Sequence, residues 1–268
     1  MTRVIHLSDL HFGKDRQDLL EPLLESIERL TPDVVAISGD FTQRARESEY
    51  REARQFLDRI EVPVLAVPGN HDIPIHRPLT RFLSPWRYYR KFISADLTPI
   101  IETSDAVILG LNSVDRFSWQ TGRMSGRQVR KACARMRPVD EHKLRILVQH
   151  HPLDHPNTTK KKPIPGAEKA LAKLIGCGAD LILSGHLHIW HAGVFAQRAT
   201  DQEGHTAIQL HAGTSLSSRV RGEPNDFNLI HVDPDYVEIE RISFDETARR
   251  FQKAEARRFD RASGRMES

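Results

Sequence analysis

Five short motifs in this chain carry side chains that bind metal ions or transfer protons. They are Asp9-Leu10-His11, Gly39-Asp40, Gly69-Asn70-His71-Asp72, His150-His151-Pro152 and Gly185-His186-Leu187-His188. Together they supply carboxylate, amide and imidazole groups but no thiolate, a combination that suits hard or borderline divalent cations. The set is larger than one metal ion requires, so we predict a site for two.

Each motif follows a hydrophobic run that reads as a strand. The runs are Val4–Ser8, Val34–Ser38, Val62–Val67, Leu144–Gln149 and Leu181–Ser184. The first three alternate with the helical stretches Gln17–Leu30 and Glu47–Ile60, which is the pattern of a βαβαβ unit with parallel strands. Because ligands collect at the carboxyl ends of the strands in an open parallel sheet, we expect the motifs to meet there.

The spacing within two motifs indicates which way the side chains point. Asp9 and His11 are two residues apart in a segment expected to be extended, so both side chains should lie on one side. His186 and His188 have the same spacing after a buried run. We therefore predict that each pair turns both of its side chains toward the site.

The other motifs contribute ligands of different kinds. Asp40 has two carboxylate oxygens and can bridge two cations. Asn70 offers a neutral amide oxygen, which adds a ligand without adding negative charge. His150 and His151 share one strand end, and at most one of them is expected to bind a metal.

The composition limits the classes of partner. The chain has 268 residues, with 39 basic and 36 acidic residues and a net charge of +3, so bulk charge gives no reason to expect a nucleic-acid partner. Cys133 and Cys177 are predicted to be free thiols in a reducing compartment. We expect no leader peptide and find no apolar run near the roughly 20 residues of a membrane span. These features favour a cytoplasmic enzyme acting on a small molecule, with peripheral membrane contact and homo-oligomers left open.

We expect one α/β domain over residues 1–245 and a polar helical tail over residues 246–268. Within the domain, residues 73–97 are rich in arginine, proline and aromatic residues and could form a cap over the site. Arg77 and Arg81 are its candidate contacts to substrate phosphate. Its aromatic side chains could stack on a base or meet a lipid, but an ordinary surface helix with aromatics in the core fits equally well. Lys160–Lys162 are expected to form a solvated loop.

The ordered set of motifs resembles the calcineurin-like metallophosphoesterase superfamily, whose series runs D-x-H, G-D, G-N-H-[D/E], H and G-H-x-H. The resemblance spans Val4 to His188. It implies a two-sheet β-sandwich flanked by helices, in four α/β/β/α layers. It also implies two divalent cations (Mn, Fe, Zn or Co), one held by Asp9, His11, Asp40 and His188, the other by Asp40, Asn70, His150 and His186.

The same resemblance implies a mechanism. A hydroxide bridging the two metals would attack phosphorus in line, and His71 would protonate the leaving group as general acid. In several members an Asp three residues after the bridging Asp supports the catalytic histidine, but Gln43 occupies that position here. How His71 is oriented, and whether Asp72 compensates, therefore stays open. His151 could contact a phosphate oxygen, support a ligand or pack in the core.

Within the superfamily, Asp-Leu-His-Phe at residues 9–12 and Gly-Asp-Phe-Thr-Gln at residues 39–43 look most like the bacterial class III cyclic-nucleotide phosphodiesterases. We therefore predict a phosphodiesterase that acts on 3′,5′-cyclic nucleotides. The first alternative is a pyrophosphate or lipid-linked diester hydrolase of the UDP-diacylglucosamine type. A DNA-repair nuclease and a metal-bound scaffold without catalysis rank below it.

Overall fold

The computed structural model describes residues 1–155, 163–194, 207–261 and 266. One sheet contains β1 (Thr2–Leu7), β2 (Val34–Ile37), β3 (Val64–Ala66), β10 (Asp226–Val232), β11 (Tyr236–Asp245) and β12 (Arg250–Asp260). The other contains β4 (Ile100–Glu102), β5 (Ala106–Gly110), β6 (Leu144–Val148), β7 (Leu181–Ser184), β8 (His191–Val194) and β9 (Ile208–His211). The α-helices are α1 (Leu20–Leu30), α2 (Glu47–Leu57), α3 (Pro78–Leu83), α4 (Arg87–Phe92), α5 (Gly126–Met136) and α6 (Ala167–Ile175).

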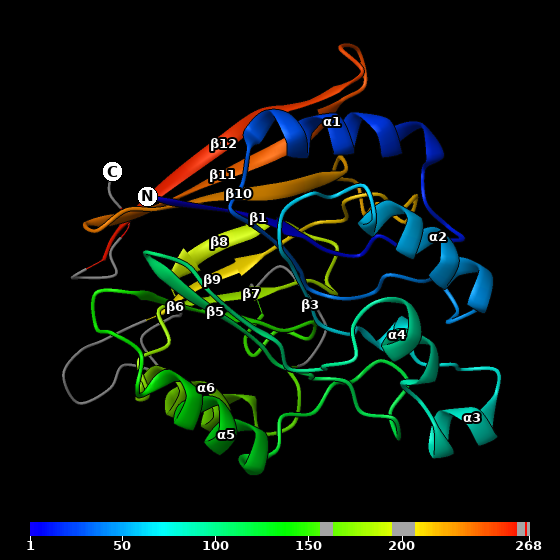
Figure 1. Cartoon of the computed structure of the whole chain (residues 1–268), viewed down its shortest axis with the longest axis horizontal. Coiled ribbons are helices and arrows are strands. Elements are labelled where there is room, and N and C mark those ends of the chain that lie inside the picture. The colour runs from blue at the N-terminus through cyan, green and yellow to red at the C-terminus, as the bar shows by residue number, and fades with distance from the viewer. Residues whose placement is uncertain (156–162, 195–206, 262–265, 267–268) are drawn as a thin grey trace.

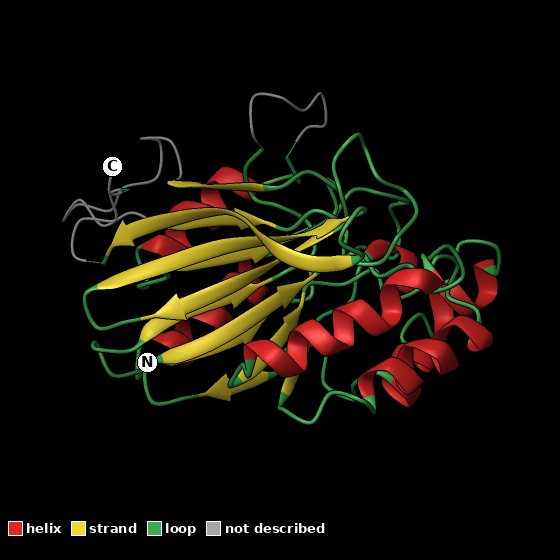
Figure 2. Ribbon diagram, turned by 90° about the horizontal axis from the view of Figure 1, so that it is seen from above, coloured by secondary structure: helices red, strands yellow, loops and turns green. Residues whose placement is uncertain are grey.

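The two sheets face each other and helices lie outside them, which confirms the predicted sandwich (Figures 1 and 2). The first sheet has the strand order β12-β11-β10-β1-β2-β3 and the second has the order β4-β5-β6-β7-β9-β8. Strands β1, β2 and β3 run parallel, as predicted, and so do β5, β6, β7 and β9. Each sheet therefore presents several strand ends along one edge.

Alternating side chains of the central strands build separate layers of core. Val4 and Val34 point between the sheets, where they pack with residues of β6 and β7. Ile5 and Val35 point the other way and pack under α1 and α2. On the far side, α5 and α6 cover the second sheet. Burial on both faces explains why these strands read as continuous hydrophobic runs.

The prediction of a helical tail after residue 245 is wrong. Residues Arg250–Asp260 form β12, which pairs antiparallel with β11 at the edge of the first sheet. The many charged residues suggested a solvated helix, but Phe251 and Phe259 are buried against the sheet. The charges lie on an exposed edge strand, where they oppose pairing with other chains.

The prediction of free thiols is also wrong. A disulfide joins Cys133 in α5 to Cys177, which follows α6, with their Cα atoms 5.3 Å apart. The two helices pack side by side on the second sheet, which brings together cysteines 44 residues apart in the sequence. Sequence spacing alone contains no sign of that packing.

Residues 73–97 form α3, α4 and the turns around them. Tyr89 is fully buried and its ring lies 6.0 Å from that of Phe41, so part of this segment belongs to the core. In the described part of the chain, no helix is both long and apolar enough to cross a membrane. The predicted loop Lys160–Lys162 lies outside the described residues.

Candidate metal centre

The first two motifs are held side by side by their backbones. The N–H of Asp9 donates to the carbonyl of Gly39 (3.1 Å) and the N–H of His11 donates to the carbonyl of Asp40 (3.0 Å). These bonds continue the parallel pairing of β1 and β2 beyond the ends of the strands. The polar side chains that follow the two strands are thereby brought to one place.

Five of the predicted ligands have left-handed backbone, including both pairs for which the spacing suggested an extended backbone. Their φ angles lie between 51° and 69°, at Asp9, His11, Asp40, His186 and His188. Each such residue costs roughly 1–3 kcal/mol, and such strain gathers at functional sites. The kinks, rather than the two-residue period of a strand, turn these side chains inward.

Asp9, His11 and His188 form the first group. Asp9 Oδ1 lies 3.1 Å from His188 Nε2 and 3.4 Å from His11 Nε2. The other oxygen, Oδ2, accepts hydrogen bonds from the hydroxyl of Ser8 (2.6 Å) and the N–H of His186 (3.0 Å). Asp9 is therefore anchored through one oxygen and presents the other to the histidines.

This group fits a metal ion. Asp9 Oδ1 and both ring nitrogens of His11 are buried and have no hydrogen-bond partner among the described residues. Buried polar atoms are rarely left in that state in proteins. A carboxylate oxygen and imidazole nitrogens are also the donors that borderline divalent cations prefer, so a cation would satisfy these atoms.

The second group meets the first at Asp40. Asp40 Oδ2 lies 3.3 Å from His150 Nε2 and 3.7 Å from His11 Nε2. Asn70 Oδ1 lies 3.2 Å from the same nitrogen of His150, and Asp40 Oδ1 accepts from the N–H of His71 at 2.8 Å. One oxygen of Asp40 therefore lies between the two groups, in the position that a bridging ligand requires.

Hydrogen bonds to backbone carbonyls select the nitrogen that each histidine turns inward. His150 Nδ1 donates to the carbonyl of Ser38 (2.8 Å), and His188 Nδ1 donates to the carbonyl of Arg219 (3.0 Å). In the neutral form of both residues the hydrogen is therefore on Nδ1 and Nε2 has the lone pair. Such outer hydrogen bonds are a regular feature of metal-binding histidines.

The buried charges of the site act on one another. Burial by itself lowers the pKa of His150, but the neighbouring Asp40 outweighs it and raises that pKa to about 9. Burial raises the pKa of Asp40, but the charges of His150 and His71 outweigh that effect and hold it well below its usual range. Without a cation, protons on the histidines balance the carboxylates, so metal ions and protons compete for this site.

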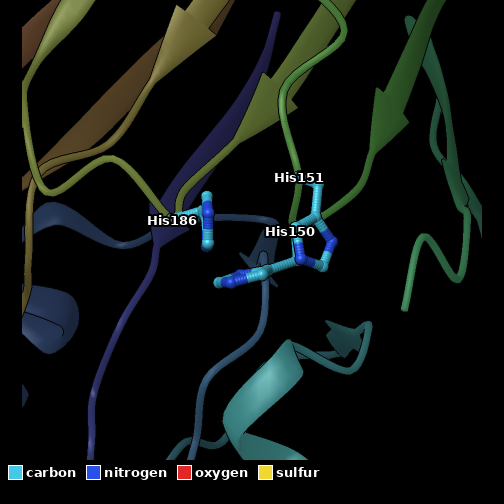
Figure 3. A group of neighbouring side chains, drawn as sticks. All are labelled: His150, His151 and His186. Carbon is cyan, nitrogen blue, oxygen red and sulfur yellow. The ribbon is translucent and has the colours of Figure 1, made fainter. Parts of the chain in front are cut away.

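His150, His151 and His186 come together from the ends of β6 and β7 (Figure 3). One nitrogen from each lies within 4.8 Å of the others. His151 thus lies in the cluster beside His150, and the prediction that at most one of the two binds a metal stays a prediction. Ser113 Oγ lies 2.9 Å from His151 Nδ1 and accepts from its backbone N–H at 3.0 Å.

A cavity of about 380 Å³ opens beside this histidine cluster. Its lining includes His151 and His186 together with Gly122, Pro152 and Ile164. The wall is mostly apolar apart from the histidines and two side chains of residues 120–121. The cavity has room for part of a small organic ester next to the candidate ligands.

His71 lies beside the first group, with its ring centroid 4.9 Å from that of His11. Its Nδ1 donates to the backbone carbonyl of Gln43 at 2.7 Å, so the backbone carbonyl of residue 43 orients the ring. Asp72 instead accepts from the N–H groups of Gly69 (2.9 Å) and Thr42 (3.0 Å). Asp72 therefore braces the loop, and burial and the nearby Asp40 raise its pKa to about 7.

Sequence reasoning did not find Arg219. It lies in the loop after β9, and its guanidinium Nη1 is 3.4 Å from His71 Nε2. The same loop holds the site together, because the Thr214 hydroxyl donates to the carbonyl of Asp9 (2.8 Å) and the carbonyl of Arg219 fixes His188. The loop has neither periodicity nor a motif, so only its folded contacts reveal it.

The two arginines predicted to bind substrate have different surroundings. Arg77 is exposed at the start of α3. Arg81 is buried, and its guanidinium donates to the carbonyls of Arg116 (2.7 Å from Nε) and Ser118. Their contact with substrate stays a prediction.

Gly185→Ala should disrupt the first group. A Cβ at residue 185 would lie 1.8 Å from Ser8 Oγ and 2.5 Å from Asp9 Oδ2, so the anchored carboxylate must move. We expect metal affinity to fall by about 10–100-fold, as for other changes to the support of ligands, measured by metal titration of the folded protein. Gly126→Ala is the matched control, because its Cβ would meet nothing closer than 3.5 Å; equal affinities of the two variants would contradict the role of Gly185.

Comparison with known proteins agrees with this geometry. The family described as Calcineurin-like phosphoesterase matches residues 2–190. A glycerophosphodiester phosphodiesterase GpdQ of Enterobacter lignolyticus is 36% identical over 80 residues, which are 25% of this chain and 28% of that protein. A probable cyclic nucleotide phosphodiesterase of Vesicomyosocius okutanii is 29% identical over 76 residues, 26% of this chain and 33% of that protein. A UDP-2,3-diacylglucosamine pyrophosphatase LpxG of Chlamydia muridarum is 32% identical over 73 residues, 26% of this chain and 22% of that protein.

These matches span at most about a third of the length of the relatives. Solved structures share the fold over nearly the whole chain. Purple acid phosphatase PPD1 from yellow lupin has a TM-score of 0.71 at 14% identity, over 97% of this chain and 53% of that one. A dimetal phosphatase from Danio rerio has a TM-score of 0.67 at 14% identity, over 94% of this chain and 98% of that one. Because the family match covers well over half of the sequence, the chain belongs to the calcineurin-like phosphoesterase family.

Proposed function

We propose that this protein is a dinuclear metal-dependent phosphodiesterase, with cyclic nucleotides as the first substrate class to test. The observation that carries the proposal is the position of Asp40 Oδ2 between His11 Nε2 and His150 Nε2, at 3.7 Å and 3.3 Å. An oxygen in that position can ligate two cations at once. The names of the GpdQ and Vesicomyosocius relatives support diester substrates.

The side chains divide the chemistry among them. One cation would be held by Asp9, His11 and His188. The other would be held by Asn70, His150 and His186. Asp40 would bind both. When bound, paired cations neutralise phosphoryl oxygens and provide hydroxide at neutral pH. His71, hydrogen-bonded to Gln43 through Nδ1, turns Nε2 outward. When His71 is protonated, its Nε2 carries a hydrogen that it can transfer to the oxygen of the departing alkoxide.

Arg219 is proposed to bind a phosphoryl oxygen of the substrate. Its guanidinium is exposed and lies beside His71 Nε2, where an anionic oxygen would accept from it. We expect Arg219→Ala to lower kcat/KM by about 10–100-fold, the loss of one charge-assisted hydrogen bond, and to weaken inhibition by inorganic phosphate. Arg221→Ala, an exposed arginine of the same loop, should change neither quantity; a similar loss in both variants would indicate a general charge effect instead.

The decisive assay compares two substrates in one preparation of manganese-loaded protein. Turnover of 3′,5′-cyclic AMP that rivals that of bis-p-nitrophenyl phosphate, and that disappears in Asn70→Ala, would support a cyclic-nucleotide enzyme. Fast cleavage of the aryl diester with negligible cyclic AMP turnover would leave a phosphodiesterase with another substrate. Stoichiometric metal without turnover of either diester would refute the enzymatic proposal.

A second candidate is hydrolysis of a pyrophosphate in a lipid-linked nucleotide. The name of the Chlamydia relative supports it, and so does the mostly apolar wall of the cavity beside His151 and His186. Release of UMP from UDP-2,3-diacylglucosamine in detergent, without turnover of cyclic AMP, would favour this candidate.

A further inference from the structure

Two neighbouring segments expose an unusual number of large apolar side chains. Of the ten such side chains that are exposed in the described part of the chain, five lie on α3 and on the loop 115–121. Leu79 and Leu83 on α3 are 77% and 78% exposed, and Phe117 and Trp119 on the loop are 69% and 67% exposed. Phe82 is the fifth. Isolated exposed apolar residues are ordinary, but a contiguous group marks a contact surface.

The two segments that carry these five side chains are bonded together. The rings of Phe82 and Phe117 stack with centroids 5.7 Å apart. Arg81 donates to the carbonyl of Arg116 (2.7 Å), and Arg116 donates back to the carbonyl of Phe82 (3.0 Å). We call Leu79, Phe82, Leu83, Phe117 and Trp119 the apolar surface. It lies at the α3 end of the molecule, away from α1 and β12 (Figure 1).

The charged residues of these two segments are mostly basic. Arg77, Arg116 and Arg123 are exposed in the same two stretches. Asp115 is the only acidic residue within residues 77–83 and 115–123, and it accepts from the N–H of Phe117 in its own turn (3.0 Å). A symmetric contact between two copies would bring these arginines toward one another. Leucine and aromatic side chains surrounded by arginine suit the boundary of an anionic bilayer instead.

The loop that carries Phe117 and Trp119 begins and ends beside the histidine cluster. Its base is closed by the N–H of Arg123, which donates to the carbonyl of Ser113 (2.8 Å), and the Ser113 hydroxyl contacts His151. Residues 120–122 between Trp119 and this base line the cavity beside His151 and His186. The loop that carries Phe117 and Trp119 therefore also lines one side of the cavity.

We propose that the apolar surface docks this protein on the surface of an anionic lipid bilayer, with its leucine and aromatic side chains among the acyl chains and its arginines at the headgroups. Binding should depend on anionic lipid and weaken with salt, because exposed charges are screened. This goes beyond the proposed hydrolysis and does not depend on which ester is cleaved. It also places the cavity close to the membrane.

The test is co-sedimentation of the full chain with vesicles of phosphatidylcholine, with and without about 30% phosphatidylglycerol, at low salt and at about 0.5 M NaCl. Wild-type protein should bind the anionic vesicles and release at high salt. Leu83→Ser combined with Trp119→Ser should lower the partition coefficient by at least about tenfold, because two apolar side chains that the bilayer would bury are lost. Arg77→Glu should lower it by about threefold or more.

Two controls match these changes. Ile100→Ser removes an exposed apolar side chain from β4, outside the apolar surface, and Arg250→Glu reverses an exposed charge on β12. Both should bind like wild type. These two variants and the Leu83→Ser, Trp119→Ser variant should cleave soluble bis-p-nitrophenyl phosphate at the wild-type rate if the hydrolytic proposal holds. Absence of binding to anionic vesicles, or equal loss in the controls, would overturn the membrane proposal. So would a wild-type dimer in light scattering that the Leu83→Ser, Trp119→Ser variant converts to monomer.

Discussion

Asp40→Asn protein is expected to bind at most about one cation per chain and to lose activity by at least about 10³-fold, since metal ions supply several kcal/mol of transition-state stabilisation. The amide has one acceptor oxygen, and its nitrogen cannot take the place of the oxygen that lies between His11 and His150. Metal content of the purified, reconstituted protein measured by elemental analysis, together with steady-state rates, checks this expectation.

The same chemical change on the surface provides the control. Asp58 follows α2 and pairs with Arg54 in an exposed ion pair, which contributes little to stability. Asp58→Asn should therefore retain two cations and full activity. If Asp40→Asn also retained two cations with wild-type affinity, Asp40 would not be the shared ligand and the dinuclear proposal would fail.

His71→Ala protein is expected to keep both cations and to separate substrates by their leaving groups. Diesters with alkoxide leaving groups need a proton, so their rates should fall by about 10²–10⁴-fold. p-Nitrophenolate departs without a proton, so bis-p-nitrophenyl phosphate should be cleaved at a rate near that of wild type. Parallel measurements of kcat on an alkyl diester and on the aryl diester test this separation, and an equal loss on both would rule out the general-acid role.

Gln43→Ala is the control for the support of His71, because it removes the side chain of residue 43 and keeps its backbone carbonyl. His71 Nδ1 donates to the carbonyl of residue 43, which any residue retains, and Gln43 Oε1 has no hydrogen-bond partner among the described residues. The variant should therefore cleave both classes of diester at nearly the wild-type rates. A loss confined to alkyl diesters would mean that the Gln43 side chain, and not the carbonyl, supports His71.

The helices and central strands were predictable because their hydrophobic patterns are local. The helices α1 (Leu20–Leu30) and α2 (Glu47–Leu57) lie within the predicted helical stretches Gln17–Leu30 and Glu47–Ile60. The edge strand β12 was not predictable in this way, because its identity depends on β11 as a partner and on the burial of Phe251 and Phe259. The disulfide likewise depends on how α5 and α6 pack.

The site could be predicted as a set of residues but not as a geometry. The order of the motifs indicated which side chains would meet, and the structure brings Asp9, Asp40 and His150 together. The left-handed turns that aim Asp9 and His11 leave no periodic signal, because each involves a single residue. Arg219 reaches His71 across 148 residues of sequence, and no local pattern contains such a contact.

The candidate ligands come from both sheets: Asp9, Asp40 and Asn70 follow strands of the first, and His150, His186 and His188 follow strands of the second. A cation shared by them would tie together two layers that pack on each other mainly through apolar side chains. If it binds only the folded chain, a hundredfold excess over its Kd adds about 2.7 kcal/mol to the free energy of unfolding. Metal supply would then govern how long the folded protein persists in the cell as well as how fast it works.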